Sequence, residues 1–322
     1  MDPKALHARR EGRRRAVRRR RRQAAGLIVV AVAGVAAVVL LADRSSSGSR
    51  AAGHPARSAD STLHLRQARG RPTAEAATST PTGPPGTEPV PILMYHVIAA
   101  PPPGALFPGL YVTPSEFAAQ MQALKQDGWH AVTPDQVEAY WTRGVSLGQG
   151  KPIVLSFDNG YQSQYTQALP VLRRLGWVGE ENIQLAGLPP SQGGLGEAQI
   201  RGLLAAGWEL DTQGISHADL ITLDSQQLLY QVAVARTILR ERYHVPVNWF
   251  CYPSGHYNAT VVAAVKAAGY AGSTTVVPGW AHPRDDPYRL HRLRVLGGTT
   301  PSELLTLIAG VRGDPPAPPS YN

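Results

Sequence analysis

The clearest hydrophobic pattern in the chain is the run Ile153–Phe157, which is interrupted only by Ser156 and stops at Asp158-Asn159-Gly160. A short, almost continuous apolar run followed by an Asp-Asn-Gly turn signal predicts a strand that is buried on both faces, as in a parallel sheet covered by helices. Asp158 is therefore expected at the carboxyl end of a buried strand, where α/β folds and barrels place reactive groups. The simpler alternative is a turn residue that caps the following helix.

Strand-like and helix-like segments alternate from residue 89 onward. The predicted strands cover 91–97, 129–132, 153–157, 208–213, 247–252, 271–276 and 292–295. The predicted helices cover 114–127, 134–141, 165–175, 197–206, 225–243 and 260–268, with a last helix from Ser302. Thr113-Pro114 is typical of a helix start, with the threonine as cap and the proline in the first turn. This alternation predicts an α/β fold built on a parallel sheet or barrel.

A different pattern occupies the first 88 residues. Residues 1–23 form a basic tail, and residues 24–42 carry no charge and are rich in Val, Ala and Leu. Because about 20 apolar residues cross a bilayer, we predict a transmembrane helix over 24–42. A cleaved signal peptide is the alternative, although its apolar region usually has only about 7–15 residues. The Ser/Thr/Pro/Gly-rich composition of 43–88 predicts a disordered linker. The folded domain is then 89–313, followed by a flexible tail over 314–322.

The excess of positive charge belongs to the amino-terminal tail alone. Within residues 1–24, Lys4 and ten arginines outweigh two acidic residues, a net charge of +9, and the remainder holds 21 basic and 21 acidic residues. The overall basicity therefore does not indicate a nucleic-acid partner. Arginines before the apolar segment predict a single-pass protein of the cell membrane, with a cytoplasmic amino terminus and an extracytoplasmic domain. Cys251 is the single cysteine, so the chain can form no internal disulfide.

Polar side chains gather at the ends of the predicted strands. They are His96, Asp158, Asn159, Asp211, Gln213, His217, Tyr252, Arg292 and Arg294. A lone histidine after a strand is more often structural than catalytic. Parallel strands end at one rim, however, and a fold has little structural reason to collect so many polar groups there. The set therefore predicts a functional site at this rim.

Several segments resemble the signature motifs of the polysaccharide deacetylases (NodB homology domain, carbohydrate esterase family 4). Ser156–Tyr161 resembles the family's Thr-Phe-Asp-Asp-Gly-Tyr, and Trp208–Leu220 resembles its second motif, in which two histidines are separated by three residues. Phe250–Asn258 resembles the third motif. Pro91–His96 is similar to the opening of the branch that acts on poly-β-1,6-N-acetylglucosamine. The resemblance covers about residues 89–312 in the family's order.

This resemblance implies a distorted (β/α) barrel and the metal-dependent removal of acetyl groups from N-acetylated sugars. It implies that Asp158 is the general base and His96 the general acid. Substrate-binding positions are expected in the same motifs and in Leu290–Val295, which matches a later landmark of the family. They are Tyr161, Tyr252, Pro253, Gly255, Tyr257, Arg292 and Arg294.

The chain departs from the family at the implied metal site. The second Asp of the first motif is Asn159, and the first His of the second motif is Gln213, which leaves His217. Amide oxygens bring neither the charge of a carboxylate nor the basicity of an imidazole. We therefore predict that a divalent ion of the Zn, Co or Ni class binds only weakly. Asp211, two residues before Gln213 on the same face of a strand, is an additional candidate ligand.

Together these features predict a membrane-anchored hydrolase that removes N-acetyl groups from a cell-surface or cell-wall glycan of the N-acetylglucosamine type. The bond that it cleaves would be a non-peptide carbon–nitrogen bond. One alternative is a catalytically inactive glycan-binding protein of the same fold. Another is a membrane-anchored scaffold. The presence of both His96 and Asp158 favours the enzyme.

Overall fold

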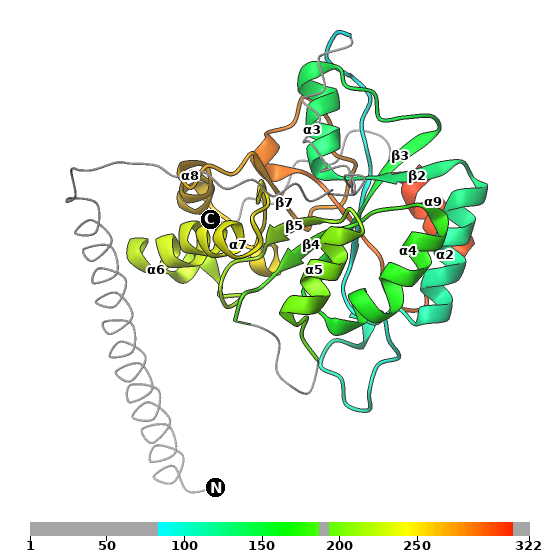
Figure 1. Cartoon of the computed structure of the whole chain (residues 1–322), viewed down its shortest axis with the longest axis horizontal. Coiled ribbons are helices and arrows are strands. Elements are labelled where there is room, and N and C mark those ends of the chain that lie inside the picture. The colour runs from blue at the N-terminus through cyan, green and yellow to red at the C-terminus, as the bar shows by residue number, and fades with distance from the viewer. Residues whose placement is uncertain (1–82, 187–192, 312–322) are drawn as a thin grey trace, which may run out of the picture. The chain divides into compact units, whose positions relative to one another are not determined.

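The computed structural model describes residues 83–186 and 193–311 (Figure 1). The predicted basic tail, the transmembrane segment over 24–42, most of the linker and the tail over 314–322 lie outside these residues. Within the described part of the chain, no helix combines the length and the apolar composition that spanning a membrane requires.

The centre of the described part is an eight-stranded sheet in which all strand pairs are parallel. The strand order is β7-β6-β5-β4-β3-β1-β8, and β2 pairs with β3. The strands are β1 Ile92–Tyr95, β2 Trp129–Val132, β3 Lys151–Asn159, β4 Glu180–Ile183, β5 Glu209–Thr212, β6 Trp249–Cys251, β7 Gly272–Thr274 and β8 Leu293–Arg294. Leu290 bridges to Thr274 of β7, and shortly afterwards β8 pairs with β1. The sheet therefore curls until one short segment links its two edges, which agrees with the predicted barrel-like α/β fold.

Helices cover the outside of the curled sheet (Figure 1). They are α2 Pro114–Gln126, α3 Pro134–Arg143, α4 Leu169–Leu175, α5 Glu197–Ala205, α6 Ser225–Leu229, α7 Ala235–Tyr243, α8 Ala259–Ala267 and α9 Pro301–Gly310. The start of α2 shows why the Thr113-Pro114 pair correctly predicted the beginning of a helix. The Thr113 hydroxyl accepts a hydrogen bond from the Glu116 amide, and the Glu116 carboxylate accepts one from the Thr113 amide. These bonds satisfy amide donors that have no partner within the helix.

The structure differs from the sequence-based prediction in two respects. Strand β4 was not predicted, because Glu-Glu-Asn-Ile has the composition of a polar surface segment, yet it is buried between β3 and β5. The helices predicted over 165–175 and 225–243 are each composite, because a π-helical turn forms part of them (η2, Gln164–Ala168, and η4, Tyr230–Val234). The second begins at Ser225, as predicted, with Asp224 as its cap.

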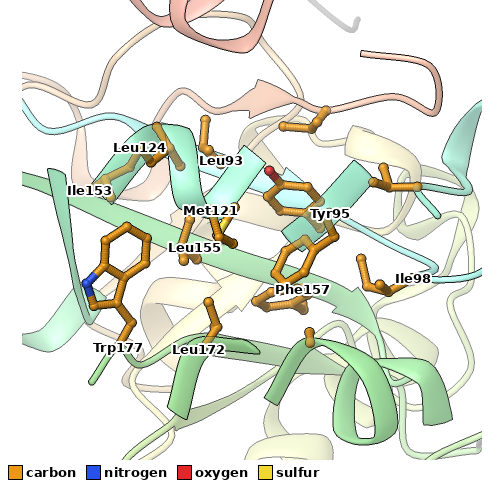
Figure 2. Packing of buried hydrophobic residues seen from close by; sticks show 14 of the residues in the cluster. Leu93, Tyr95, Ile98, Met121, Leu124, Ile153, Leu155, Phe157, Leu172 and Trp177 are labelled. Carbon is orange, nitrogen blue, oxygen red and sulfur yellow. The ribbon is translucent and has the colours of Figure 1, made fainter. Parts of the chain in front are cut away.

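The two faces of the strands have different roles. Leu155 and Phe157 of β3 point outward into the hydrophobic layer between sheet and helices (Figure 2). There the ring of Phe157 stacks on that of Tyr95 of β1, with centroids 5.6 Å apart. Because side chains alternate along a strand, Ser156 and Asp158 point to the opposite, inner side of the curled sheet. The outer face of the strands therefore contributes apolar side chains to the hydrophobic core, and the inner face contributes the polar side chains of the candidate site.

Candidate active site

Asp158 is the centre of the polar cluster on the inner face. Its carboxylate is 1 % exposed and accepts two hydrogen bonds from the Arg292 guanidinium, 2.8 Å to Oδ1 and 2.9 Å to Oδ2. The Asn182 amide donates to Oδ1 at 3.3 Å, and the Cys251 thiol lies 3.5 Å from Oδ2. A bidentate guanidinium–carboxylate pair fixes orientation as well as charge. The carboxylate is therefore held rigidly, and the alternative of a helix-capping turn residue does not apply.

Arg292 keeps this buried carboxylate ionised. Burial by itself would raise the pKa of Asp158, but the charge and hydrogen bonds of Arg292 outweigh it, and the pKa lies below its ordinary value. Arg292 is itself 1 % exposed and also donates to the Thr275 carbonyl at 2.8 Å and to the Ser156 hydroxyl at 3.1 Å. We predicted Arg292 as a substrate-binding residue. The structure instead places it beneath Asp158, where it positions the carboxylate. Arg294, by contrast, is exposed.

A neighbouring carboxyl group does not compete for Arg292. Glu180 points to the same inner face, since it pairs with Ser156 across β3 and β4. Burial raises the pKa of Glu180 to about 8. Glu180 is therefore mostly protonated at neutral pH, and Asp158 remains the anionic partner of the guanidinium.

His96 follows β1 and lies beside Asp158, with 4.0 Å between its Nε2 and Oδ2 of the carboxylate. Burial lowers the pKa of His96 to about 4, although the charge of Asp158 acts in the opposite direction. The imidazole of the free protein is therefore neutral at pH 7. Its Nδ1 is buried and has no hydrogen-bond partner in the described part of the chain.

Gln164 holds the ends of β1 and β3 together. Its Nε2 donates to the His96 carbonyl at 2.9 Å and to the Asp158 carbonyl at 2.8 Å. Gln164 was not predicted as a site residue, because nothing in its sequence position distinguishes it from a surface glutamine. The π-helical turn η2 brings it over the strand ends. Its effect is to fix the distance between the two predicted catalytic groups.

Of the three main predicted metal positions, Asn159 is the last residue of β3, and Gln213 and His217 follow β5. Asn159 and His217 have φ angles of 80° and 52°, in the left-handed region. Asparagine adopts this region more readily than most residues. The Oε1 atom of Gln213 is buried and has no hydrogen-bond partner in the described residues. Burial lowers the pKa of His217 against the opposing charge of Asp158, so its imidazole is neutral at pH 7.

These residues do not fit a tight site for a zinc-class ion. The donor set consists of one imidazole and two neutral amides. Across residues 83–186 and 193–311, no three His, Cys, Asp or Glu side chains come together in a way that could hold a metal. Asp211 has a structural role, since its Oδ1 accepts the amides of Asn248 at 2.9 Å and Trp249 at 2.7 Å, where β6 begins. A ligand role for Asp211 remains a prediction.

The aromatic residues predicted to bind substrate are largely buried. The Tyr252 hydroxyl donates to the Tyr288 carbonyl at 3.0 Å, and its ring stacks on Tyr257 with centroids 4.9 Å apart. These two rings therefore support the segment after β6 rather than offer an open face. Tyr161, after β3, is buried as well. The other two predicted residues lie buried in the turn after β6: Pro253 and Gly255.

Comparisons with known proteins agree with the motifs and the fold. The sequence model of the polysaccharide deacetylase family matches residues 147–273. YxkH of Bacillus subtilis (strain 168), a protein assigned to the polysaccharide deacetylases, is 29 % identical over 214 residues, which cover 66 % of this chain and 74 % of YxkH.

Two solved structures are similar to the described domain. The structure of the Streptococcus pyogenes deacetylase PplD in complex with acetate has a TM-score of 0.63 and 25 % identity, and the match covers 69 % of this chain and 99 % of PplD. IcaB from Ammonifex degensii, with a TM-score of 0.57 and 22 % identity, shares the fold over 69 % of this chain and 97 % of its own. The motifs, the curled parallel sheet and these matches together identify a polysaccharide deacetylase domain in this chain.

Proposed function

We propose that this protein is a hydrolase that removes N-acetyl groups from a cell-surface or cell-wall glycan of the N-acetylglucosamine type. The observation that carries the proposal is the Asp158 carboxylate, which Arg292 keeps ionised and which lies 4.0 Å from His96. A buried carboxylate in its basic form at neutral pH, beside an imidazole, is suited to general acid–base chemistry. The family membership makes amide deacetylation the reaction class that best matches this pair.

In the proposed reaction, Asp158 takes a proton from the water that attacks the acetyl carbonyl carbon. The carbon–nitrogen bond then breaks, and His96 in its protonated form supplies a proton to the leaving nitrogen, giving acetate and a free amine. Arg292 and Gln164 keep the two groups in place throughout. We assign no step to a metal ion, because the amide-rich donor set does not fit one. We propose that this degenerate site binds divalent ions only weakly.

The direct test is acetate release from N-acetylglucosamine oligomers by the purified protein, with Zn²⁺, Co²⁺ or Ni²⁺ added in turn. Release that depends on the protein is the expected result. The amides at positions 159 and 213 favour one second candidate, a glycan-binding protein without catalysis. A protein that binds the oligomers and yet releases no acetate with any of the three ions would establish that candidate instead.

The pKa of His96 leads to a prediction about pH. Because the free protein holds this imidazole neutral above about pH 4, the protonated fraction rises about tenfold for each pH unit of acidification. If protonated His96 is the acid, kcat/KM for acetate release should rise between about pH 7 and about pH 5. His96→Gln should lower the rate by about 10²–10⁴-fold and abolish this slope. A rate that is flat over this range in the wild type would assign His96 a neutral, hydrogen-bonding role.

The location of the domain also remains a proposal. We propose that residues 24–42 anchor the chain in the membrane and that the domain faces the outside of the cell, because arginines precede this uncharged segment. Protease added to intact cells should release a soluble fragment whose amino terminus lies within 43–88. Protection of the domain until the cells are opened would contradict this topology.

A further inference from the structure

A surface pocket that contains two arginines lies at the opposite end of the sheet from the candidate site. It has a volume of about 650 Å³ and is formed by α7 and the segment that leads into β6. We call it the α7 pocket. Asn248 directly precedes β6, whereas Asp158 lies at the carboxyl end of β3. Because the strands are parallel, the pocket is at the amino-terminal end of the sheet, away from the rim with His96. Its polar lining residues are Arg236, Thr237, Arg240, Glu241, His244 and Asn248.

Arg236 is held in a fixed position without a counter-ion. Its Nε atom donates to the Val247 carbonyl at 2.7 Å, and its Nη1 atom donates to the Ala268 carbonyl at 3.1 Å. The guanidinium also lies over the ring of Tyr270, 5.1 Å from the centroid. In the described part of the chain, no carboxylate forms an ion pair with it. The cation is therefore preorganised, and its charge is not neutralised by the protein.

A second guanidinium lies beside the first. Arg240 follows Arg236 by one helical turn, so the two side chains are neighbours on α7. Burial lowers the pKa of Arg236, and the charge of Arg240 lowers it further, because the two cations repel each other. A basic side chain in the last helical turn complements the helix dipole, which accounts for Arg240 but not for Arg236 one turn earlier. Like charges at this spacing destabilise a helix, and an anion between them would remove that cost.

We propose that the α7 pocket binds a phosphate ester, with the phosphate group between Arg236 and Arg240. A phosphate presents more acceptor oxygens than a carboxylate does, so that two guanidinium groups can share it. A single phosphate group would fill only part of the pocket, and the organic part of the ester would occupy the remainder. Val245 and Pro246 provide apolar surface there, and Thr237 and His244 provide hydrogen-bonding groups for hydroxyls of a polyol or sugar. A ligand in this position leaves the rim with Asp158 free.

A small ester matches this pocket better than a membrane surface does. Segments that bind the surface of an anionic membrane combine basic residues with large apolar side chains that enter the lipid. None of the large hydrophobic side chains that are strongly exposed in the described residues lines the pocket. The basic groups also lie in a recess rather than on a protruding segment. These features favour a discrete ligand.

Binding of sn-glycerol 1-phosphate to the purified full-length chain tests the proposal directly. In titration calorimetry, we expect the wild type to bind this ester and not to bind glycerol. Arg240→Gln should increase the dissociation constant about tenfold, the lower limit for loss of a hydrogen bond to a charged group, because Arg240 is exposed. Binding should also weaken as the salt concentration rises.

Two further variants on the same helix serve as controls. Arg242 is another exposed arginine of α7 but is not part of the lining. Arg242→Gln removes the same charge and should leave the dissociation constant within about twofold of the wild-type value. Glu241 is the acidic residue of the lining, and its charge opposes that of the ligand. Glu241→Gln should therefore change the affinity in the opposite direction, lowering the dissociation constant by about twofold.

The outcomes are independent of the proposed deacetylase activity. Because the α7 pocket is remote from Asp158, Arg240→Gln should release acetate at the wild-type rate, and weaker ester binding supports the pocket even if no acetate is released. A wild type that does not bind the ester overturns the proposal, and so does equal weakening by Arg240→Gln and Arg242→Gln, which would indicate a general effect of charge. Binding to phosphatidylglycerol vesicles that Arg240→Gln abolishes, without ester binding by the wild type, would overturn it in favour of a membrane surface.

Discussion

Asp158→Asn is expected to reduce acetate release from N-acetylglucosamine oligomers by about 10²–10⁴-fold, the usual contribution of a general acid–base group. The structure adds a second effect. Arg292 is buried with Asp158, and its guanidinium donates to both oxygens of the carboxylate. Removing the negative charge leaves a buried cation without its counter-ion, which costs about 3–5 kcal/mol. The variant should therefore also lose stability against urea by about this amount.

A double variant separates the catalytic effect from the structural one. In Asp158→Asn combined with Arg292→Met, neither buried charge is present, so much of the lost stability should return. Acetate release should not return, because the base is still missing. Activity and urea unfolding should be measured on all three variants, with Arg292→Met as the remaining single change. A double variant no more stable than Asp158→Asn would refute the role given to the pair, and a folded Asp158→Asn with wild-type activity would refute the role of Asp158 as base.

Restoring the family's ligands should tighten metal binding by at least about 10³-fold. Asn159→Asp with Gln213→His replaces two neutral amides by a carboxylate and an imidazole beside His217. Changes outside the ligand shell alone alter metal affinity by about 10–100-fold, so two ligand replacements should exceed that range. The backbone permits the first change, because Asp tolerates the positive φ of 80° that Asn159 adopts. The buried, unpartnered Oε1 of Gln213 marks the position from which the new imidazole would reach the ion.

Zinc affinity can be measured by competition with a chelating dye, which requires no activity from the enzyme. The wild type should bind Zn²⁺ weakly, each single variant should be intermediate, and His217→Ala should remove the gain in the double variant. A wild type that holds one tight equivalent of zinc and is insensitive to His217→Ala would show that the metal site lies elsewhere.

Local sequence signals were sufficient for most of the fold. The nearly continuous apolar run of β3 predicted a buried strand, and the polar residues at the strand ends predicted one rim for Asp158 and His96, which the structure places 4.0 Å apart. The Thr-Pro pair at α2 predicted its first residue, Pro114. Such signals succeed because they act over a few residues: a short apolar run is ended by the turn residues that follow it, and a helix cap bonds to an amide only three residues away.

The sequence by itself therefore determined the alternating elements of an α/β domain, the deacetylase-like motifs and the amide side chains at two positions where the family has metal ligands. Only the tertiary structure decided the rest of the site. The charged residues of β4 are buried because neighbouring strands enclose them, and Arg292 pairs with Asp158 across 134 residues of chain. Gln164 joins two strand ends that only the folded sheet makes adjacent. The physical reason is that burial and charge pairing depend on how the whole sheet curls, and no local pattern specifies that curvature.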